Sequence, residues 1–167
     1  MLKEMEARNQ RSPLHILAAE SHGQIAQVRE LFLEYAQSLG FSLCFQSFDA
    51  ELAGLPGDYA PPEGRLLLAQ YDDQLAGCAA LHKLEPAICE MKRLYLRPQF
   101  RGKGLGRALA EQIIAEARQI GYQLIRLDTV EPVMRDAVGM YRKIGFREIA
   151  PYRVNPIAGT LYMEMQL

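Results

Sequence analysis

Three glycines at alternate positions form the segment Arg101-Gly102-Lys103-Gly104-Leu105-Gly106, which lies between a predicted strand and a predicted helix. Glycine permits a sharp turn out of a strand and lets backbone N–H groups approach another molecule closely. The first N–H groups of a helix lack intrahelical partners and carry the positive end of its dipole. Arg107 adds a further positive side chain. The segment is therefore predicted to bind an anion such as a phosphate or pyrophosphate.

Two common phosphate-binding motifs do not match this turn. A Walker-type loop requires Ser or Thr directly after Gly-Lys, to place a hydroxyl on magnesium, but Lys103 is followed by Gly104. A dinucleotide fingerprint G-x-G-x-x-G that began at Gly102 would require glycine at the position of Arg107. Both motifs are therefore disfavoured.

A different pattern matches the turn and a second segment further along the chain. Residues 101–106 match R-x-x-G-x-G, and the segment from Ala137 to Phe146 matches A-x-x-x-Y-x-x-x-G-F. With both segments in this order, the chain resembles the GCN5-related N-acetyltransferase (GNAT) superfamily. The resemblance covers about Leu14 to Leu167 and is clearest from Glu90 onward.

The resemblance implies a single α/β domain over 14–167, preceded by a polar N-terminal tail over 1–13. The implied architecture is the three-layer α/β/α acyl-CoA N-acyltransferase fold, with a mixed, mostly antiparallel sheet of about six to seven strands that is splayed at the cofactor site. Hydrophobic patterns predict strands at 14–19, 65–71, 75–82, 89–97, 123–128, 146–149 and 160–166. They predict helices at 21–39, 45–55, 104–120 and 134–144.

The resemblance also implies acetyl-CoA as the cofactor, with its pyrophosphate on the glycine turn. In the family, the pantetheine arm pairs with the end of the preceding strand as an extra strand would. The implied cofactor-binding residues are Leu94, Tyr95, Leu96, Arg101, Gly102, Lys103, Gly104, Leu105, Gly106 and Arg107. The implied activity is direct transfer of the acetyl group from the thioester to a primary amine on a small molecule or a peptide, and family members are often homodimers.

Tyr141 corresponds to the tyrosine of the second family segment and is the candidate general acid. A phenol with a pKa near 10 is protonated at neutral pH and can give its proton to a departing thiolate. The alternative is that Tyr141 only packs in the core of its helix. The match of Gly145 and Phe146 to the family segment favours the catalytic role.

Glu90 is the candidate base, because it lies on the strand before the glycine turn, where some family members place such a glutamate. A carboxylate there could accept the proton of the acceptor amine directly or through a water, especially if burial raised its pKa. The alternatives are a glutamate at the strand edge paired with Lys92 or solvent, and a chain of waters in place of a base.

The segment from Tyr152 to Gly159 joins the last two predicted strands and contains an Asn-Pro turn. The sequence N-P-I-A-G-T-L-Y-M-E that starts at Asn155 is similar to a segment of one uncharacterised subgroup of the superfamily. Arg153 and Asn155 are therefore candidate substrate-binding residues, and Arg153 would favour an acceptor with a carboxylate or phosphate. The alternative is a hairpin loop with a solvated arginine.

The composition restricts the partners. A chain of 167 residues with 49% hydrophobic and 23% charged residues is typical of a globular domain. Its net charge of −1 argues against general binding to nucleic acid or membranes, although positive side chains gather over 92–107. No apolar run approaches the roughly 20 residues of a membrane span, so a cytoplasmic location is expected. Three cysteines, Cys44, Cys78 and Cys89, show no metal-ligand spacing, so no metal is expected.

Two other functions fit part of the pattern. The turn could hold coenzyme A or an acyl-CoA as a signal in a binding module that transfers nothing. It could also belong to a nucleotide- or phosphosugar-binding protein unrelated to acyl transfer. The pair of segments in the family order favours the acetyltransferase over both.

Overall fold

A mixed sheet forms the centre of the computed structural model, which describes residues 13–43 and 47–167. Within these residues the sheet has seven strands in the order β1-β2-β3-β4-β5-β7-β6. Neighbouring strands are antiparallel except for β4 and β5, which are parallel. The strands are β1 (Leu14–Ala18), β2 (Arg65–Tyr71), β3 (Gln74–Glu85), β4 (Ile88–Leu96), β5 (Leu124–Val130), β6 (Arg147–Ile149) and β7 (Thr160–Gln166).

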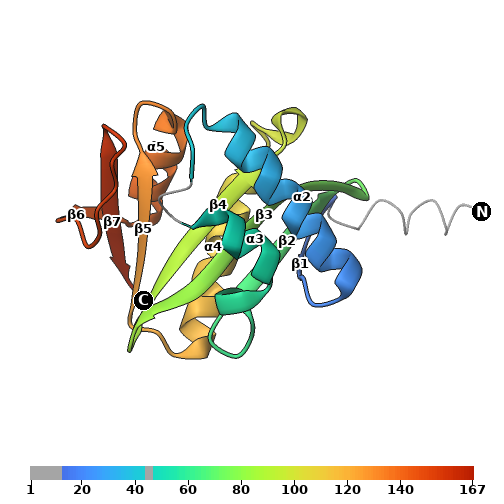
Figure 1. Cartoon of the computed structure of the whole chain (residues 1–167), viewed down its shortest axis with the longest axis horizontal. Coiled ribbons are helices and arrows are strands. Elements are labelled where there is room, and N and C mark those ends of the chain that lie inside the picture. The colour runs from blue at the N-terminus through green and yellow to red at the C-terminus, as the bar shows by residue number, and fades with distance from the viewer. Residues whose placement is uncertain (1–12, 44–46) are drawn as a thin grey trace, which may run out of the picture.

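Helices cover both faces of the sheet (Figure 1). On one face lie α2 (His22–Ser38) and α3 (Phe48–Gly54), whose buried residues share one core cluster with the sheet. On the other face α4 (Leu105–Ile120) and α5 (Arg135–Ile144) share a second cluster with it. Two short 3-10 turns, η2 (Gly57–Tyr59) and η3 (Pro98–Phe100), lie in the connections. The predicted three-layer α/β/α architecture is confirmed.

Local sequence signals explain where the helices begin and end. Ser21 and Gln24 form a capping box at the start of α2, since the Gln24 N–H donates to Ser21 Oγ at 3.2 Å and the Ser21 N–H donates to Gln24 Oε1 at 3.0 Å. Helix α4 begins after Gly104, with a φ of 79°, and ends at Gly121, with a φ of 105°. Only glycine adopts such left-handed conformations without strain.

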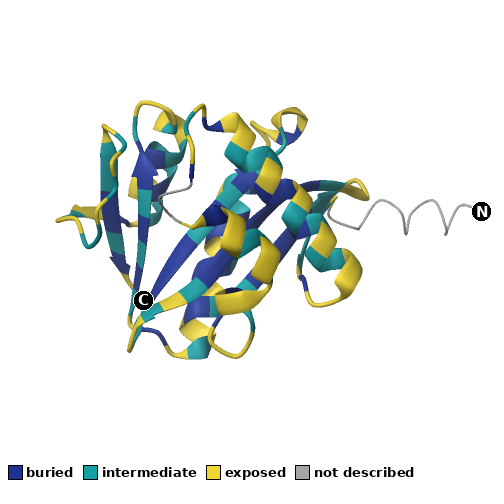
Figure 2. Ribbon diagram, in the orientation of Figure 1, coloured by how far each residue is buried: buried dark blue, intermediate teal, exposed yellow. Residues whose placement is uncertain are grey.

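The buried sides of the helices follow the apolar spacing of the sequence (Figure 2). Leu109, Ile113 and Ala117 of α4 are fully buried against one face of the sheet. Val28 and Phe32 of α2 are fully buried against the other face. Burial of a Val, Leu, Ile or Phe side chain stabilises the fold by roughly 1.5–3 kcal/mol, so the two clusters together hold the sheet between its helices.

Strand β4 carries the irregularity that shapes the centre of the sheet. Ala79 of β3 lies opposite two residues of β4, Arg93 and Leu94, and Arg93 has a φ of 59°. This β-bulge reverses the alternation of side chains along the strand. On the other side, β4 pairs with β5 only from Ile88 to Glu90. Beyond Glu90 the two strands separate, as the predicted splay requires (Figure 1).

Two arginines, one buried and one half-buried, attach helices to this part of β4. Arg93, only 4% exposed, donates to both carboxylate oxygens of Glu51 in α3, at 2.9 and 3.1 Å. The Tyr59 hydroxyl donates to the same carboxylate at 2.9 Å. Arg97, just after β4, donates to Glu34 of α2, with its closest contact at 2.7 Å. Both flanking helices are therefore held in place by ion pairs to one strand.

The predicted elements agree with the observed ones to within a few residues. Strand β3 continues to Glu85, beyond the predicted end at 82, because it pairs with β4 as far as Ile88. The predicted short helix over 45–55 is α3, and its first part lies outside the described residues, as does the predicted tail up to residue 12. The domain boundary therefore stays a prediction.

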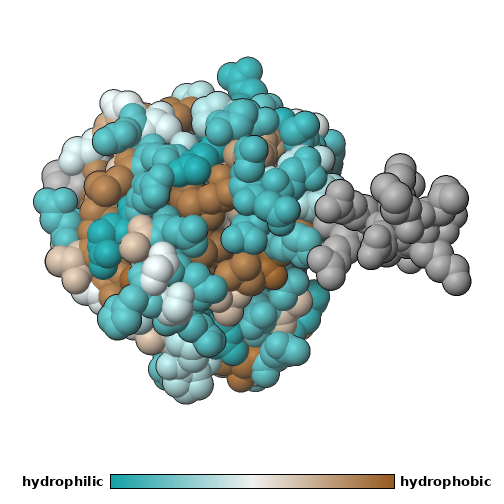
Figure 3. Space-filling view, turned by 90° about the vertical axis from the view of Figure 1, so that its right-hand side faces the viewer, coloured by the Kyte–Doolittle hydropathy of each residue, from teal (hydrophilic) through white to brown (hydrophobic). Residues whose placement is uncertain are grey.

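No helix in the described part of the chain is both long and apolar enough to cross a bilayer. On the face drawn in Figure 3, apolar side chains gather in small patches among hydrophilic ones. The large apolar side chains with the greatest exposure among the described residues are Leu33, Val133 and Val154.

The Arg93–Glu51 pair predicts a large stability effect. In Glu51→Ala the buried guanidinium would lose its carboxylate, and the free energy of unfolding should fall by roughly 3–5 kcal/mol. In the control Glu63→Ala, which breaks the exposed pair with Lys83, the loss should be below about 1 kcal/mol. Urea denaturation measures both. A loss in Glu51→Ala as small as that in the control would contradict the role of the pair.

Candidate active site

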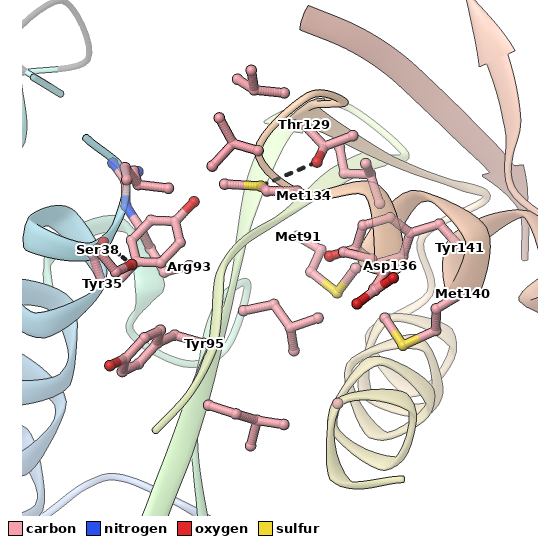
Figure 4. A pocket seen from close by; sticks show the side chains of 18 of the residues that line it. Tyr35, Ser38, Met91, Arg93, Tyr95, Thr129, Met134, Asp136, Met140 and Tyr141 are labelled. Carbon is pink, nitrogen blue, oxygen red and sulfur yellow. Dashed lines mark hydrogen bonds between the residues drawn. The ribbon is translucent and has the colours of Figure 1, made fainter. Parts of the chain in front are cut away.

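A cavity of about 650 Å³ opens where β4 and β5 separate. Its walls come from the end of α2, the ends of β4 and β5, the first turn of α4, and α5. Figure 4 shows Tyr35 and Ser38 of α2 on one side and Met140 and Tyr141 of α5 on the other. Nine of the ten predicted cofactor-binding residues line this cavity: Leu94, Tyr95, Leu96, Arg101, Gly102, Gly104, Leu105, Gly106 and Arg107.

The glycines of the turn serve two different purposes. Gly102 and Gly104 have φ values of 77° and 79°, which favour glycine. Gly106 lies in the first turn of α4, and a Cβ added there would meet Leu96 Cδ1 at 3.5 Å and Met140 Sδ at 3.9 Å. Because these two residues line the cavity, the missing Cβ of Gly106 widens it. The turn therefore presents backbone N–H groups at the start of α4 to open space.

The positive charges near the turn fall into two groups. Arg93 and Arg97 are committed to glutamates of α3 and α2. Arg101 and Arg107 line the cavity, where Arg101 donates to the Leu96 carbonyl at 3.1 Å and Arg107 forms an exposed pair with Glu111. Lys103 does not line the cavity, and its ammonium lies 5.5 Å from the centre of the Tyr71 ring. An anion at the turn would therefore meet Arg101 and Arg107.

Tyr141 lies deep in the wall formed by α5. Its side chain packs edge-on against Phe146, with ring centroids 5.7 Å apart. Its hydroxyl has no hydrogen-bond partner among the described residues. Every fully buried side-chain N or O atom in that part of the chain does have a partner, so the Tyr141 hydroxyl is not fully buried and must reach the cavity. Burial raises the pKa of Tyr141 above its ordinary value, so the phenol carries its proton at neutral pH.

Glu90 does not face the cavity. Its carboxylate is fully buried on the α2–α3 side of the sheet. His82 Nε2 lies 2.9 Å from Glu90 Oε1, the Tyr152 hydroxyl donates to Oε2 at 2.6 Å, and Arg153 donates to the same oxygen. Lys92 lies 3.8 Å from Oε1. The carboxylate is therefore surrounded by donors that also hold the segment before β7.

These partners reverse the expected effect on acidity. Burial raises the pKa of Glu90, but the hydrogen bond to His82, the charge of Lys92 and the contact with Arg153 together lower it to about 2. Burial therefore does not leave Glu90 with the raised pKa that would favour its action as a base. A carboxylate with so low a proton affinity is suited to holding its partners and poorly suited to taking a proton from an amine.

The two predicted substrate-binding residues lie in different surroundings. Arg153 does not line the cavity, and its guanidinium is committed to Glu90. Asn155 does line it and donates to Asp128 Oδ2 at 3.4 Å. Asn155 Oδ1 also accepts the Ile157 N–H at 2.9 Å, which closes the Asn-Pro turn. The structure therefore brings Asn155, and not Arg153, to the cavity.

Several cavity or network residues were not predicted from the sequence. Asp128 lines the cavity from the end of β5, and Tyr35 lines it from α2. His82 and Tyr152 contact Glu90. The available signals were an acidic residue at the end of a predicted strand for Asp128 and helical spacing for Tyr35. No local pattern marked His82 or Tyr152.

The sheet and the cavity define an acyl-CoA N-acyltransferase fold, and comparisons with known proteins give the family. Residues 25–146 match the model of the Acetyltransferase (GNAT) family. The chain therefore belongs to this family and is an acyltransferase. It is 38% identical to an uncharacterized N-acetyltransferase of Schizosaccharomyces pombe over 93% of this chain and 96% of that protein.

Solved structures support the same fold. An acetyltransferase from Streptococcus agalactiae superimposes with a TM-score of 0.74 and 22% identity, over 94% of this chain and all of that one. A GNAT family acetyltransferase from Elizabethkingia anophelis, with acetyl-CoA bound, superimposes with a TM-score of 0.68 and 19% identity, over 94% of this chain and all of that one. The predicted acyl-CoA N-acyltransferase fold is thus confirmed.

The low pKa of Glu90 predicts a pH-dependent stability difference. A carboxyl whose pKa falls from 4.5 to about 2 on folding stabilises the protein above pH 4.5 and loses this effect as the pH falls toward 2. The size of the shift corresponds to about 3 kcal/mol. The advantage of wild type over Glu90→Gln in free energy of unfolding should therefore shrink steadily from pH 5 to pH 3.

Chemical denaturation at a series of pH values measures this difference. Glu111→Gln, which alters an exposed carboxylate, is the control and should follow the wild-type curve. Parallel curves for wild type and Glu90→Gln would show that the carboxyl titrates alike in the folded and unfolded chains.

Proposed function

We propose that this protein is an acetyl-CoA-dependent N-acetyltransferase that moves the acetyl group directly from the thioester to a primary amine. The observation that carries the proposal is a single cavity lined by the α4 turn, the open end of β4 and Tyr141. A bound acyl-CoA would need an anion site for its pyrophosphate, an unpaired strand edge for its pantetheine arm and a proton donor such as a phenol beside its sulfur. Acetyl-CoA or coenzyme A is bound by several proteins of similar fold.

The turn fits a pyrophosphate. The N–H groups at the start of α4 carry the positive end of the helix dipole, and Arg101 and Arg107 stand beside them. Leu105 is buried and anchors the turn to the core. Gly102 and Gly104 give the turn its shape, and Lys103 contributes charge near its outer side. These residues would hold the diphosphate end of coenzyme A.

The edge of β4 fits the pantetheine arm. After Glu90 the backbone of β4 has lost β5 as its neighbour, so the edge around Leu94 to Leu96 lacks a strand on that side. An extended chain with amide groups can pair with such an edge as an added strand would. An arm in this position would run past Gly106 toward Tyr141, along the wall that lacks a Cβ.

Tyr141 is the proposed general acid. When bound, acetyl-CoA supplies an acetyl thioester whose sulfur leaves as a thiolate. The Tyr141 hydroxyl faces the cavity and keeps its proton at neutral pH, so it can donate to that sulfur. We propose that the acceptor loses its proton to water, since Glu90 lies outside the cavity and has a pKa of about 2. Direct base catalysis by Glu90 remains the alternative.

A binding module without transfer is the rival function. It would need the α4 turn and the β4 edge, but it would not need a protonated phenol deep in the same cavity. The position of the Tyr141 hydroxyl therefore favours transfer. We also propose that the chain belongs with the uncharacterised acetyltransferases that carry the segment beginning at Asn155, and that this segment borders the acceptor.

Removal of the Tyr141 hydroxyl tests the acid role. Tyr141→Phe should lower kcat by about a hundredfold or more, because general acid catalysis contributes factors of this size. Its affinity for coenzyme A should not change. Tyr122→Phe is the control, since that hydroxyl donates to the Glu63 carbonyl outside the cavity. Full turnover by folded Tyr141→Phe would remove Tyr141 from the role.

A methyl group at position 106 tests the coenzyme A site. Gly106→Ala should fold, because its new contacts are at ordinary distances, but the methyl group would narrow the cavity and lower coenzyme A affinity at least tenfold. Gly139→Ala adds the same methyl group to α5, where a Cβ meets nothing within 4 Å, and should bind normally.

Thermal shifts with coenzyme A, ATP and NADH provide the measurement. A ligand at a hundred times its dissociation constant stabilises the fold by about 2.7 kcal/mol. Selective stabilisation by coenzyme A that weakens in Gly106→Ala alone is the expected pattern. An equal response to ATP or NADH would indicate a nucleotide-binding protein instead.

A further inference from the structure

Asp128 lines the cavity and is its acidic residue on the α2–α3 side of the sheet. It lies on β5, two residues beyond the last pair with β4, and is half-buried. Leu127 turns toward the α4–α5 core, so Asp128 on the alternating strand turns to the opposite side. It therefore lies where an acceptor could approach, on the side of the splayed strands away from α4 and α5.

Asp128 has no cationic partner of its own. Among the described residues its hydrogen-bond partner is the neutral Asn155 amide, at 3.4 Å, and no Lys, Arg or His lies within ion-pair distance of it. Lys92 and Arg153 are close enough to interact electrostatically with it, but both pair with Glu90. A half-buried carboxylate in a cavity is stabilised by a cation that donates hydrogen bonds to it.

The contacts of Glu90 with Tyr152 and Arg153 fix the position of Asn155, the neighbour of Asp128. Tyr152 and Arg153 are held at Glu90, and Tyr162 of β7 donates to the Arg153 carbonyl at 2.8 Å. Asn155, two residues after Arg153, donates a hydrogen bond to Asp128. A shift of the segment before β7 would therefore break its contacts with Glu90.

The walls around Asp128 describe the rest of the acceptor. On the side of α2 the cavity is lined by the apolar or aromatic residues Tyr35, Leu39, Phe41 and Leu43, and Met134 lines it at the start of α5. Arg93 is paired with Glu51, so it offers no free charge there. Lys92 also lines the cavity on this side, but its ammonium lies 3.8 Å from Glu90 Oε1 and is paired there. A ligand beside Asp128 would therefore meet this carboxylate, an ammonium already held by Glu90, and an apolar surface. An acceptor with its own carboxylate beside the amine would be repelled by Asp128.

We infer that Asp128, with Asn155, binds the ammonium group of the acceptor, and that the acceptor is an apolar primary amine without a neighbouring carboxylate, such as an aralkylamine or an amidated amino acid. This inference rests on the proposed acetyl transfer and assigns its acceptor. In that reaction the nitrogen forms a bond to the acetyl carbon while the carbon–sulfur bond breaks. Of the two protons that the nitrogen loses, one reaches the sulfur through Tyr141 and the other leaves to water.

Three related amines provide the test: 2-phenylethylamine, L-phenylalanine amide and L-phenylalanine, each with saturating acetyl-CoA. Wild type should acetylate the first two and use L-phenylalanine at least tenfold less efficiently. Asp128→Asn should raise KM for the first two amines by roughly ten- to hundred-fold, the usual effect of losing a charge-assisted hydrogen bond. It should also reduce the discrimination against L-phenylalanine, while KM for acetyl-CoA stays the same.

Asp136→Asn is the matched control, because Asp136 also lines the cavity but lies in the first turn of α5. It should leave the preference among the three amines unchanged, which separates a local contact from a general change in charge. Thermal shift with coenzyme A is measured for wild type and every variant. No response in wild type would show that the proposed coenzyme A site is wrong, which is a separate failure from a wrong acceptor.

Three results would overturn the inference. One is a wild-type protein that binds coenzyme A but transfers no acetyl group to 2-phenylethylamine or to L-phenylalanine amide. Another is transfer to L-phenylalanine as efficient as transfer to its amide. The third is an Asp128→Asn variant whose KM for the amines equals that of wild type.

Discussion

The separation of β4 from β5 is the constraint on which the site depends. The two strands pair over only three residues, and the splay then opens a cavity in the middle of the sheet. Unpaired backbone groups inside a sheet are unfavourable unless water or a ligand satisfies them. The bulge at Arg93 turns the side chains of β4 at this level, so that Leu94 and Leu96 lie on the side of α4. The edge of β4 and the turn before α4 therefore line the same cavity.

Buried and half-buried charges hold the sides of this opening. Arg93 and Arg97 fasten α3 and α2 to β4, while Glu90 fastens the segment before β7 to the same strand. Such ion pairs add little net stability compared with apolar packing, but breaking one partner is costly. Their consequence is geometric, because the walls of the cavity cannot move apart without exposing an unpaired charge.

Much of this arrangement could be predicted from the sequence, since it depends on local signals. The capping box at Ser21, the glycines around α4 and the apolar spacing of the helices each act within a few residues. The role of Glu90 could not be predicted, because Tyr152 and Arg153 reach it from more than sixty residues away. Burial alone suggests a raised pKa, and only the tertiary contacts show that donors reverse it. Lys103 matched the turn by position, yet it lies outside the cavity.

The most direct measurement is a crystal structure of the protein with coenzyme A. The expected electron density places the pyrophosphate against the N–H groups that follow Gly102 and Gly104, the pantetheine arm along Leu94 to Leu96, and the sulfur within hydrogen-bonding distance of the Tyr141 hydroxyl. A sulfur remote from Tyr141, or a pyrophosphate bound away from the α4 turn, would contradict the proposed transfer site.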